Sequence, residues 1–159
     1  MARVRRTVVE HNSSQLNDDS EGLHGLVMEL IRATGLLQPD QLLVPGETVS
    51  MSQGFALHEL DADTPLSQQE LADRLHLDKS SVSRMAAELA RRGLIVRERD
   101  PDNRRFYRLR ITPEGRALHA RMRGTFHDRY TRWVAELTVA EREALLTGLA
   151  ALVRVIRGR

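Results

Sequence analysis

The chain has 159 residues, 41% of them hydrophobic and 29% charged, so it can bury a core and is not broadly disordered. No apolar run approaches the roughly 18 residues that a membrane-spanning helix requires, and no apolar segment follows the basic N-terminus as it would in a secretory signal. Cysteine is absent, which excludes disulfides, thiolate nucleophiles and cysteine zinc sites. We therefore expect a soluble, cytoplasmic protein without a membrane partner.

The net charge of +2 hides a strong asymmetry along the chain. Residues 10–70 hold eleven carboxylates and one basic residue, whereas residues 84–123 hold twelve arginines and five acids. This separation indicates one surface that meets a polyanion and another that is kept away from it. On composition alone, a solvated charged face is an equally good interpretation.

The N-terminal part divides into an arm, a helix with its following loop, and a short second helix. Residues 1–19 combine basic and polar side chains with little apolar periodicity, which predicts a flexible arm. Residues 20–37 have helical spacing, and glycines and prolines then predict a loop that continues to about residue 49. The second helix is expected after Ser52, and the side chains it would bury are Phe55, Leu57 and Leu60.

Two capped helices form the most informative stretch. Ser67 and Glu70 make a capping box that begins the first, and Asp78 caps a second, which Gly93 ends. The inward-facing residues of the second helix are Val82, Met85, Ala86 and Leu89. Short capped helices joined by a turn of about three residues are typical of a helix-turn-helix.

A hairpin and two further helices complete the chain. Residues 94–99 and 106–111 read as strands, and the polar, doubly basic turn between them predicts a wing. Thr112 and Pro113 begin a long helix, and Thr138 begins the last one in a second capping box. The apolar stripe of the long helix is Leu118, Met122, Phe126, Tyr130, Trp133 and Leu137.

The face of the second capped helix that lies opposite its apolar stripe is suited to DNA. Small hydroxyl residues let the helix approach closely, and Arg84 can bond guanine O6 and N7 together. Alone, such a face is more often simply exposed to solvent, but the preceding capped helix and the following basic hairpin favour DNA reading. The candidate DNA-binding residues are Lys79, Ser80, Ser81, Ser83, Arg84, Arg91, Asn103, Arg104 and Arg105.

The motifs LSQQELADRL at 66–75, DKSSVSR at 78–84, GLIVRERDPDNRR at 93–105 and LRITPEG at 109–115 resemble the MarR family of regulators. The resemblance is sharpest over residues 50–120. It implies a mainly α fold with a small β wing. Within this fold, residues 50–112 would form a winged helix-turn-helix. It also implies dimerisation through an N-terminal helix and loop at 20–49 and C-terminal helices at 113–159.

The same resemblance implies a homodimer that binds double-stranded DNA at a pseudo-palindromic operator. It also implies release by a small aromatic or amphipathic effector, held between the dimerisation and DNA-binding regions. The residues expected near this ligand are His24, Met28, Phe55 and His58. The residues expected at the dimer contact are Leu23, Leu26, Leu30, Leu145, Leu149, Leu152 and Ile156.

One position departs from the family pattern. The usual wing motif Asp-x-Arg falls on residues 103–105, so Asn103 stands where the acid that holds the wing arginine is expected. An amide oxygen still accepts an N–H, without the ionic component, and Asp100 or Asp102 are the alternative partners. Arg105 is the best candidate for insertion into a narrow minor groove.

No catalytic constellation competes with this interpretation. The six histidines show no close metal-ligand spacing, and no histidine or lysine is placed to activate the serines near Arg84. We therefore expect no enzyme, no cofactor and no metal, but a nucleoid-associated bacterial or archaeal regulator, more plausibly a repressor. The alternatives are an architectural DNA-binding protein without ligand control and a winged-helix accessory subunit of an enzyme.

Overall fold

The computed structural model describes residues 2–35, 44, 46–62, 64–100 and 107–158, with side chains from Ser14 onward. By its internal contacts the chain forms two compact units, Met1–Gln41 and Leu42–Arg159. The first unit contains helix α1, and the second contains all the other described helices and strands.

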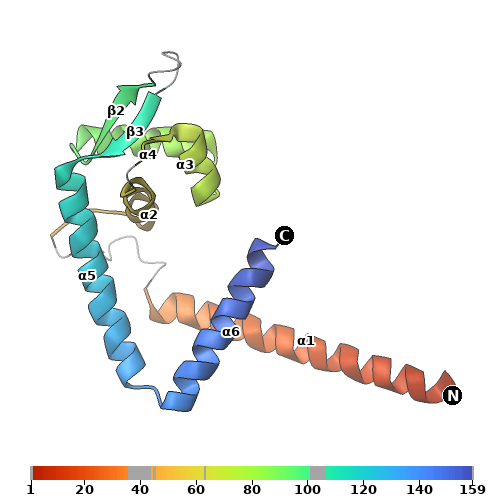
Figure 1. The fold of residues 1–159 in the computed structure, drawn as a ribbon. Coiled ribbons are helices and arrows are strands. Elements are labelled where there is room, and N and C mark those ends of the chain that lie inside the picture. The colour runs from red at the N-terminus through yellow and green to blue at the C-terminus, as the bar shows by residue number, and fades with distance from the viewer. Residues whose placement is uncertain (1, 36–43, 45, 63, 101–106, 159) are drawn as a thin grey trace. The chain divides into compact units, whose positions relative to one another are not determined.

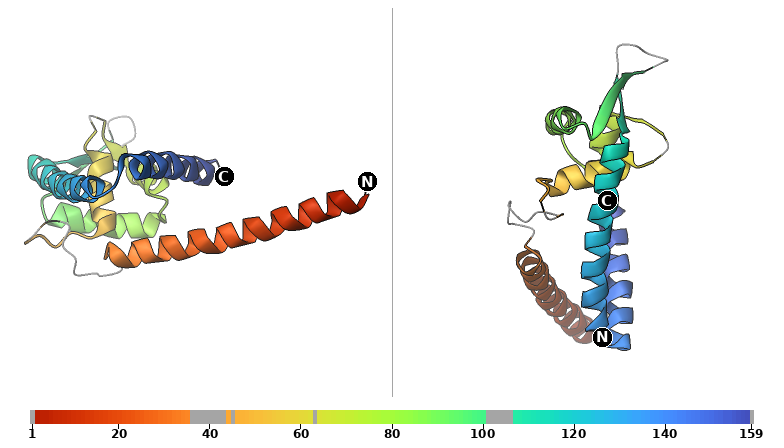
Figure 2. Two further views of the ribbon diagram at one scale, coloured as in Figure 1. Left: turned by 90° about the horizontal axis from the view of Figure 1, so that it is seen from below. Right: turned by 90° about the vertical axis from the view of Figure 1, so that its left-hand side faces the viewer.

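Helix α1 runs from Ala2 to Ala33 as one continuous helix (Figure 2). The sequence predicted a flexible arm over residues 1–19, and helix α1 extends through residues 2–19. The expectation rested on apolar periodicity, which reports burial of one face and not helicity itself. Every described side chain from residue 14 to residue 30 is exposed within this chain, so nothing in this segment requires an apolar stripe.

The second unit begins with a winged helix-turn-helix, as predicted (Figure 1). Its elements are α2 (Met51–Leu60), β1 (Leu66–Ser67), α3 (Gln68–Leu75), α4 (Lys79–Arg91), β2 (Ile95–Arg99) and β3 (Tyr107–Ile111). The strands form an antiparallel sheet in the order β1-β3-β2. The sequence did not reveal β1, because a two-residue strand is too short to show alternation.

The predicted helix ends are confirmed with one shift. Ser67 and Glu70 form the capping box of α3, and the Asp78 side chain accepts from the Ser81 amide at the start of α4. Helix α2 is capped by Ser50, two residues before the start predicted from Ser52, because Gln53 completes a capping box with Ser50. Gly93 lies just past the end of α4 with φ +72°, a conformation that glycine adopts without a steric penalty.

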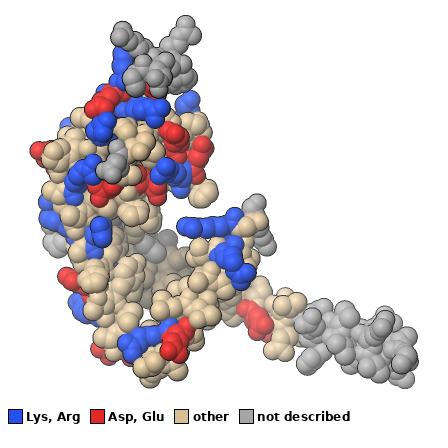
Figure 3. All heavy atoms as spheres, viewed as in Figure 1, with Lys and Arg blue, Asp and Glu red and all other residues tan. Residues whose placement is uncertain are grey.

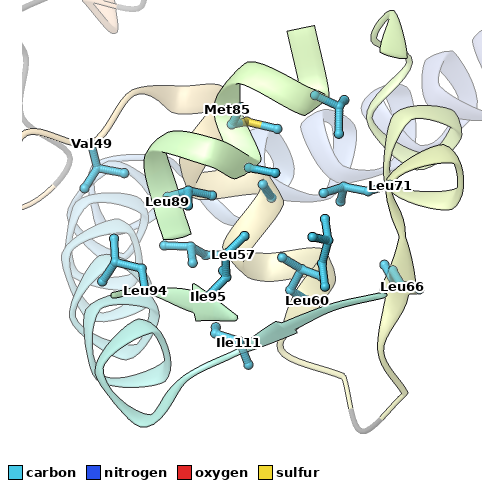
Figure 4. Packing of buried hydrophobic residues seen from close by; sticks show 14 of the residues in the cluster. Val49, Leu57, Leu60, Leu66, Leu71, Met85, Leu89, Leu94, Ile95 and Ile111 are labelled. Atoms are coloured by element: carbon cyan, nitrogen blue, oxygen red, sulfur yellow. The ribbon is translucent and has the colours of Figure 1, made fainter. Parts of the chain in front are cut away.

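One apolar core joins the helices of the winged module to the sheet (Figure 4). The predicted stripe of α4 is buried in it completely. Leu57 and Leu60 of α2 are buried as expected, but the expectation for Phe55 is wrong, since its side chain is 55% exposed. Phe55 lies one residue from both Gly54 and Ala56 on a short helix whose inward face is already filled by smaller side chains.

The long helix α5 (Pro113–Ala135) begins inside this core and leaves it (Figure 1). Leu118 and Met122 are buried and Phe126 packs partly against the core, whereas Tyr130 and Trp133 further along are exposed. Helix α6 (Val139–Arg157) follows, capped by Thr138 as predicted, and none of its residues is buried in the single chain. No helix among the described residues combines the length and apolar character needed to cross a membrane.

Gly115 allows the first turn of α5 to lie against the turn after α4. A Cβ at this position would overlap the backbone oxygen of Leu94 and lie 2.8 Å from Cγ1 of Ile111. The cap residue Thr112 closes the same contact, because its amide donates to the Leu94 oxygen (3.1 Å) and its hydroxyl to the Gly93 oxygen (2.7 Å). The start of α5 is therefore attached directly to the turn that follows α4.

We predict that Gly115→Ala lowers the free energy of unfolding by about 1–3 kcal/mol, because a backbone oxygen cannot move aside as a flexible side chain can. Gly124→Ala is the matched control in the same helix. It has nothing within 4 Å of its added Cβ. It should raise the free energy of unfolding by about 0.5–1 kcal/mol through helix propensity. Urea unfolding of both variants checks this, and equal effects would contradict the close contact.

Candidate nucleic-acid interface

Helix α4 presents one outer face of small and basic side chains. Lys79, Ser80, Arg84, Ala87 and Arg91 are exposed, and the opposite side of the helix is buried. Ser81 and Ser83 flank this face and are half-buried. The structure therefore brings the six predicted candidates of this helix onto one surface, with the small residues at the N-terminal end where a helix meets DNA base edges most closely.

Asp78 organises the N-terminal turn of α4. Its carboxylate accepts from the Ser80 hydroxyl (2.5 Å), the Ser81 amide (2.8 Å) and the Ser81 hydroxyl (2.7 Å). The hydrogen bond from Ser80, followed by those from Ser81, lowers the pKa of the Asp78 carboxyl from its ordinary value. Both hydroxyls are thus oriented before any ligand arrives, with their oxygens still able to accept.

The two arginines of this face differ in how they are held. Arg84 Nη2 donates to the Ser81 hydroxyl at 3.4 Å, which places its guanidinium toward the N-terminal end of the helix. Arg91 makes a bidentate pair with Glu88 (2.7 and 2.9 Å), and those hydrogen bonds raise the pKa of Arg91. Arg84 is therefore better placed than Arg91 to exchange its present contact for one with a base.

The wing lies beside this helix and is attached to it. Strands β2 and β3 pair from Ile95 with Ile111 to Arg99 with Tyr107, which confirms the predicted hairpin. Arg97 Nη2 donates to the backbone oxygen of Ser83 (3.1 Å), so the hairpin contacts α4 directly. The candidates Asn103, Arg104 and Arg105 lie outside the described residues.

Charges of both signs alternate on the face of the winged module in Figure 3. Glu98 pairs with Arg110 at 3.3 Å on the hairpin, and Asp100 pairs with Arg108 at 2.7 Å. Acidic partners of this kind hold the guanidinium groups in place. The composition of residues 84–123 suggested the excess of arginine but could not show this pairing, since ion pairs join strands that are distant in sequence.

Two charged contacts attach the winged module to α5. At the end of α2, the Asp61 carboxylate pairs with Arg116 (2.6 Å) and with Nδ1 of the buried His119 (2.8 Å). Desolvation opposes the ionisation of Asp61, but hydrogen bonds from His119 and Arg116 outweigh it and lower the pKa of that carboxyl. Nδ1 of His119 therefore donates to the Asp61 carboxylate, and Nε2 of the same ring lies 3.3 Å from Nδ1 of His58.

Glu47 makes the second contact. Its carboxylate lies 2.7 Å from Arg121 of α5 and 3.6 Å from Arg92 at the C-terminal cap of α4. Arg92 also donates to the backbone oxygen of Thr48 at 2.6 Å. The end of α4 and the third turn of α5 therefore share one acid. Sequence reasoning missed this residue, because nothing in a loop glutamate indicates two partners.

The remaining candidates occupy three helices. His24 and Met28 lie on α1, and Phe55 and His58 lie three residues apart on α2, where both are exposed. The residues expected at the dimer contact, Leu23, Leu26, Leu30, Leu145, Leu149 and Ile156, are exposed in the single chain, and Leu152 is half-buried. Within the described part of the chain, no cluster of three or more histidine and acidic side chains is arranged to hold a metal ion.

A family model described as the MarR family matches residues 49–106. The chain is 33% identical over 113 residues to a protein of Thauera aromatica named as a candidate transcriptional regulator of the hcr operon, covering 67% of this chain and 68% of that protein. The solved PcaV transcriptional regulator from Streptomyces coelicolor, in complex with its natural ligand, is 29% identical with a TM-score of 0.63, covering 81% of this chain and 89% of PcaV.

A third match is to the fold alone. The transcriptional regulator BldR from Sulfolobus solfataricus has a TM-score of 0.68 at 22% identity, covering 86% of this chain and 96% of BldR. The two folds therefore superpose well beyond the winged module, although the two sequences have little in common.

Proposed function

Because this chain belongs to the MarR family of DNA-binding transcriptional regulators, which are not enzymes, we propose that it is a repressor that binds a pseudo-palindromic operator as a homodimer. We propose further that a small aromatic or amphipathic molecule releases it from DNA. The observation that carries the DNA-binding part is the outer face of α4, where Arg84 is exposed above a turn of preoriented serine hydroxyls.

This face supports direct reading of bases. An arginine near the N-terminal end of a helix in the major groove can donate two parallel hydrogen bonds to guanine. Ser80 and Ser81 are small enough to let the helix enter deeply, and the free amides of the first turn favour phosphate. Arg104 and Arg105 of the wing are proposed to add affinity with little base preference, through phosphates or the minor groove.

We predict that Arg84→Ala weakens operator binding by about 1–3 kcal/mol and relaxes the preference at one base-pair position. Arg104→Ala and Arg105→Ala should weaken binding to most sequences alike, each with a salt slope smaller by about 1 for a lost phosphate contact. Titration of operator and random DNA at several salt concentrations measures both effects.

Arg123→Ala is the control for loss of one positive charge, since Arg123 is exposed on α5, outside the winged module. It should leave base preference unchanged. If Arg84→Ala discriminates operator from random DNA as well as the parent protein does, the assignment of the reading face to α4 is wrong.

The homodimer is supported by apolar surface that the single chain leaves uncovered. Leu145, Leu149 and Ile156 on α6 are each about half exposed or more, and Tyr130 and Trp133 on α5 are similarly exposed. Contiguous apolar surface of this kind marks an interaction site. A self-complementary contact would also place two recognition helices in a symmetric pair, which a pseudo-palindromic operator requires.

We predict that Leu149→Glu combined with Leu152→Glu causes aggregation or unfolding and not a folded monomer, because obligate dimers often lack a stable monomer. Thr147→Glu, on the opposite side of α6, is the matched control and should leave the dimer intact. Light scattering of the parent at micromolar concentration should give about twice 18.0 kDa. A stable parent species of 18.0 kDa would refute the dimer.

The effector is proposed to act through α5. This helix carries the charged contacts of Asp61 and Glu47 with the winged module, so a ligand that alters its tilt changes the orientation of α4. Phe55 and His58 on α2 remain proposed ligand contacts, and His24 and Met28 stay predictions from the sequence. A tenfold change in occupancy requires a preference of only about 1.4 kcal/mol for the incompetent arrangement, which lies within the usual range of coupling energies.

We predict that phenolic ligands followed by the fluorescence of Trp133, the single tryptophan, bind more weakly when operator DNA is saturating. Linkage requires the ligand to weaken operator binding by the same factor. Ligands that bind tightly yet leave operator affinity unchanged would refute release by effector. If a broad set of aromatic acids and phenols gives no binding, the architectural alternative is favoured instead.

A further inference from the structure

An ion pair between buried Asp100 and partly exposed Arg108 lies at the base of the wing. Arg108 Nε, on β3, donates to Oδ2 of Asp100, directly after β2, at 2.7 Å. Nη1 of the same guanidinium donates to the backbone oxygen of Pro65 at 3.3 Å, just before β1. One side chain thus connects the ends of all three strands. Asp100 is 8% exposed and is, with His119, one of two polar residues buried among those that the structure describes.

The neighbouring pair on the same hairpin provides the comparison. Arg110 and Glu98 are 3.3 Å apart and about half exposed, a setting in which an ion pair contributes little to stability. The Arg108 and Asp100 side chains are 32% and 11% exposed, and their contact is shorter. A charged pair that is more shielded from water depends more on its partner, so we expect loss of one partner to disturb the hairpin more at this pair than at its neighbour.

A hollow of about 520 Å³ lies beside the pair. Gln68 and Glu70 of α3, Lys79 of α4, Tyr107, and the two members of the pair are among the residues that line it. Positive charge on Arg108 is also among the causes that lower the pKa of Glu70, after the hydrogen bonds that the Ser67 amide and hydroxyl make to that carboxylate. The guanidinium therefore faces acids on both the wing and the capping box of α3.

We propose that Arg108 and Asp100 position the wing for DNA without touching DNA themselves. This inference rests on the proposed function of the wing. Asp100 and Tyr107 are the described residues that border residues 101–106, the segment that carries Arg104 and Arg105. Fixing Asp100 to Arg108 holds the end of β2 against β3, whose first residue is Tyr107. Strand ends that are held before binding lower the conformational cost of docking on DNA.

The direction in which Asp100→Asn changes DNA affinity distinguishes a positioning role from a direct contact with DNA. Asp100→Asn removes a negative charge from a DNA-binding domain, and general electrostatics then favours tighter binding to a polyanion. If the pair positions the wing, the same substitution weakens binding, because the arginine loses its ionised partner. A direct phosphate contact by Arg108 predicts the opposite result, since the guanidinium would be released for DNA.

The experiment compares Asp100→Asn, Arg108→Met and the double variant with Glu98→Gln and Arg110→Met, the matched changes in the exposed pair. Operator affinity is measured against salt concentration, at a temperature where unfolding curves show every variant to be folded. We expect Asp100→Asn and Arg108→Met each to bind the operator about tenfold more weakly, a loss of about 1.4 kcal/mol in binding free energy, with a reduced salt slope. The double variant should be no weaker than either single one, and Glu98→Gln should bind at least as tightly as the parent.

Tighter or unchanged binding by Asp100→Asn, with weaker binding by Arg108→Met, would overturn the proposal in favour of direct contact. Unchanged binding by both would overturn it in favour of a purely structural pair. If Asp100→Asn does not fold, Arg108→Lys replaces it, with weaker binding expected although the charge is kept, and parental binding by that variant would contradict the proposal. Failure of the parent protein to bind any DNA would refute the proposed function and not this pair.

Discussion

The structure depends on one apolar core that is shared by the recognition helix, the sheet and the first turns of α5. Leu89 of α4, Leu109 of β3 and Leu118 of α5 are all buried in it. Gly115 brings the start of α5 against the Leu94 backbone, where no larger residue fits. Because protein cores are close-packed and transmit displacement, the recognition helix and the beginning of α5 are constrained to move together. The orientation of one therefore reports the orientation of the other.

This attachment explains why polar contacts gather where they do. Asp61 and Glu47 meet α5 outside the core, on Arg116 and Arg121, and Glu47 also meets Arg92 at the end of α4. These partly exposed pairs contribute little to stability, but they set the direction in which α5 leaves the core. Beyond Phe126 the α5 side chains Tyr130 and Trp133 are exposed, and α6 buries no residue in the single chain. Whatever covers these outer helices can thus act on the recognition helix through α5.

Local chemistry made much of the fold predictable. Capping residues such as Ser67, Asp78 and Thr138 placed helix starts correctly, because a hydroxyl or carboxylate satisfies free amides within a single turn. The outward-facing side of α4 followed from helical periodicity alone. The prediction for Phe55 failed, and α1 extends through the expected arm, because apolar spacing shows which face could be buried and not what buries it. Ion pairs such as Arg108 with Asp100 join separate strands and had no local signal.

We propose that two copies of α4, held by the outer helices, read one symmetric DNA site. Selection of binding sequences from random double-stranded DNA by the full chain, followed by sequencing, tests this most directly. The account predicts an inverted repeat whose half-site centres lie about 34–36 Å apart, one helical turn, with guanine at the position lost in the Arg84→Ala selection. Enrichment of a single unrepeated half-site, or of no sequence at all, would contradict it.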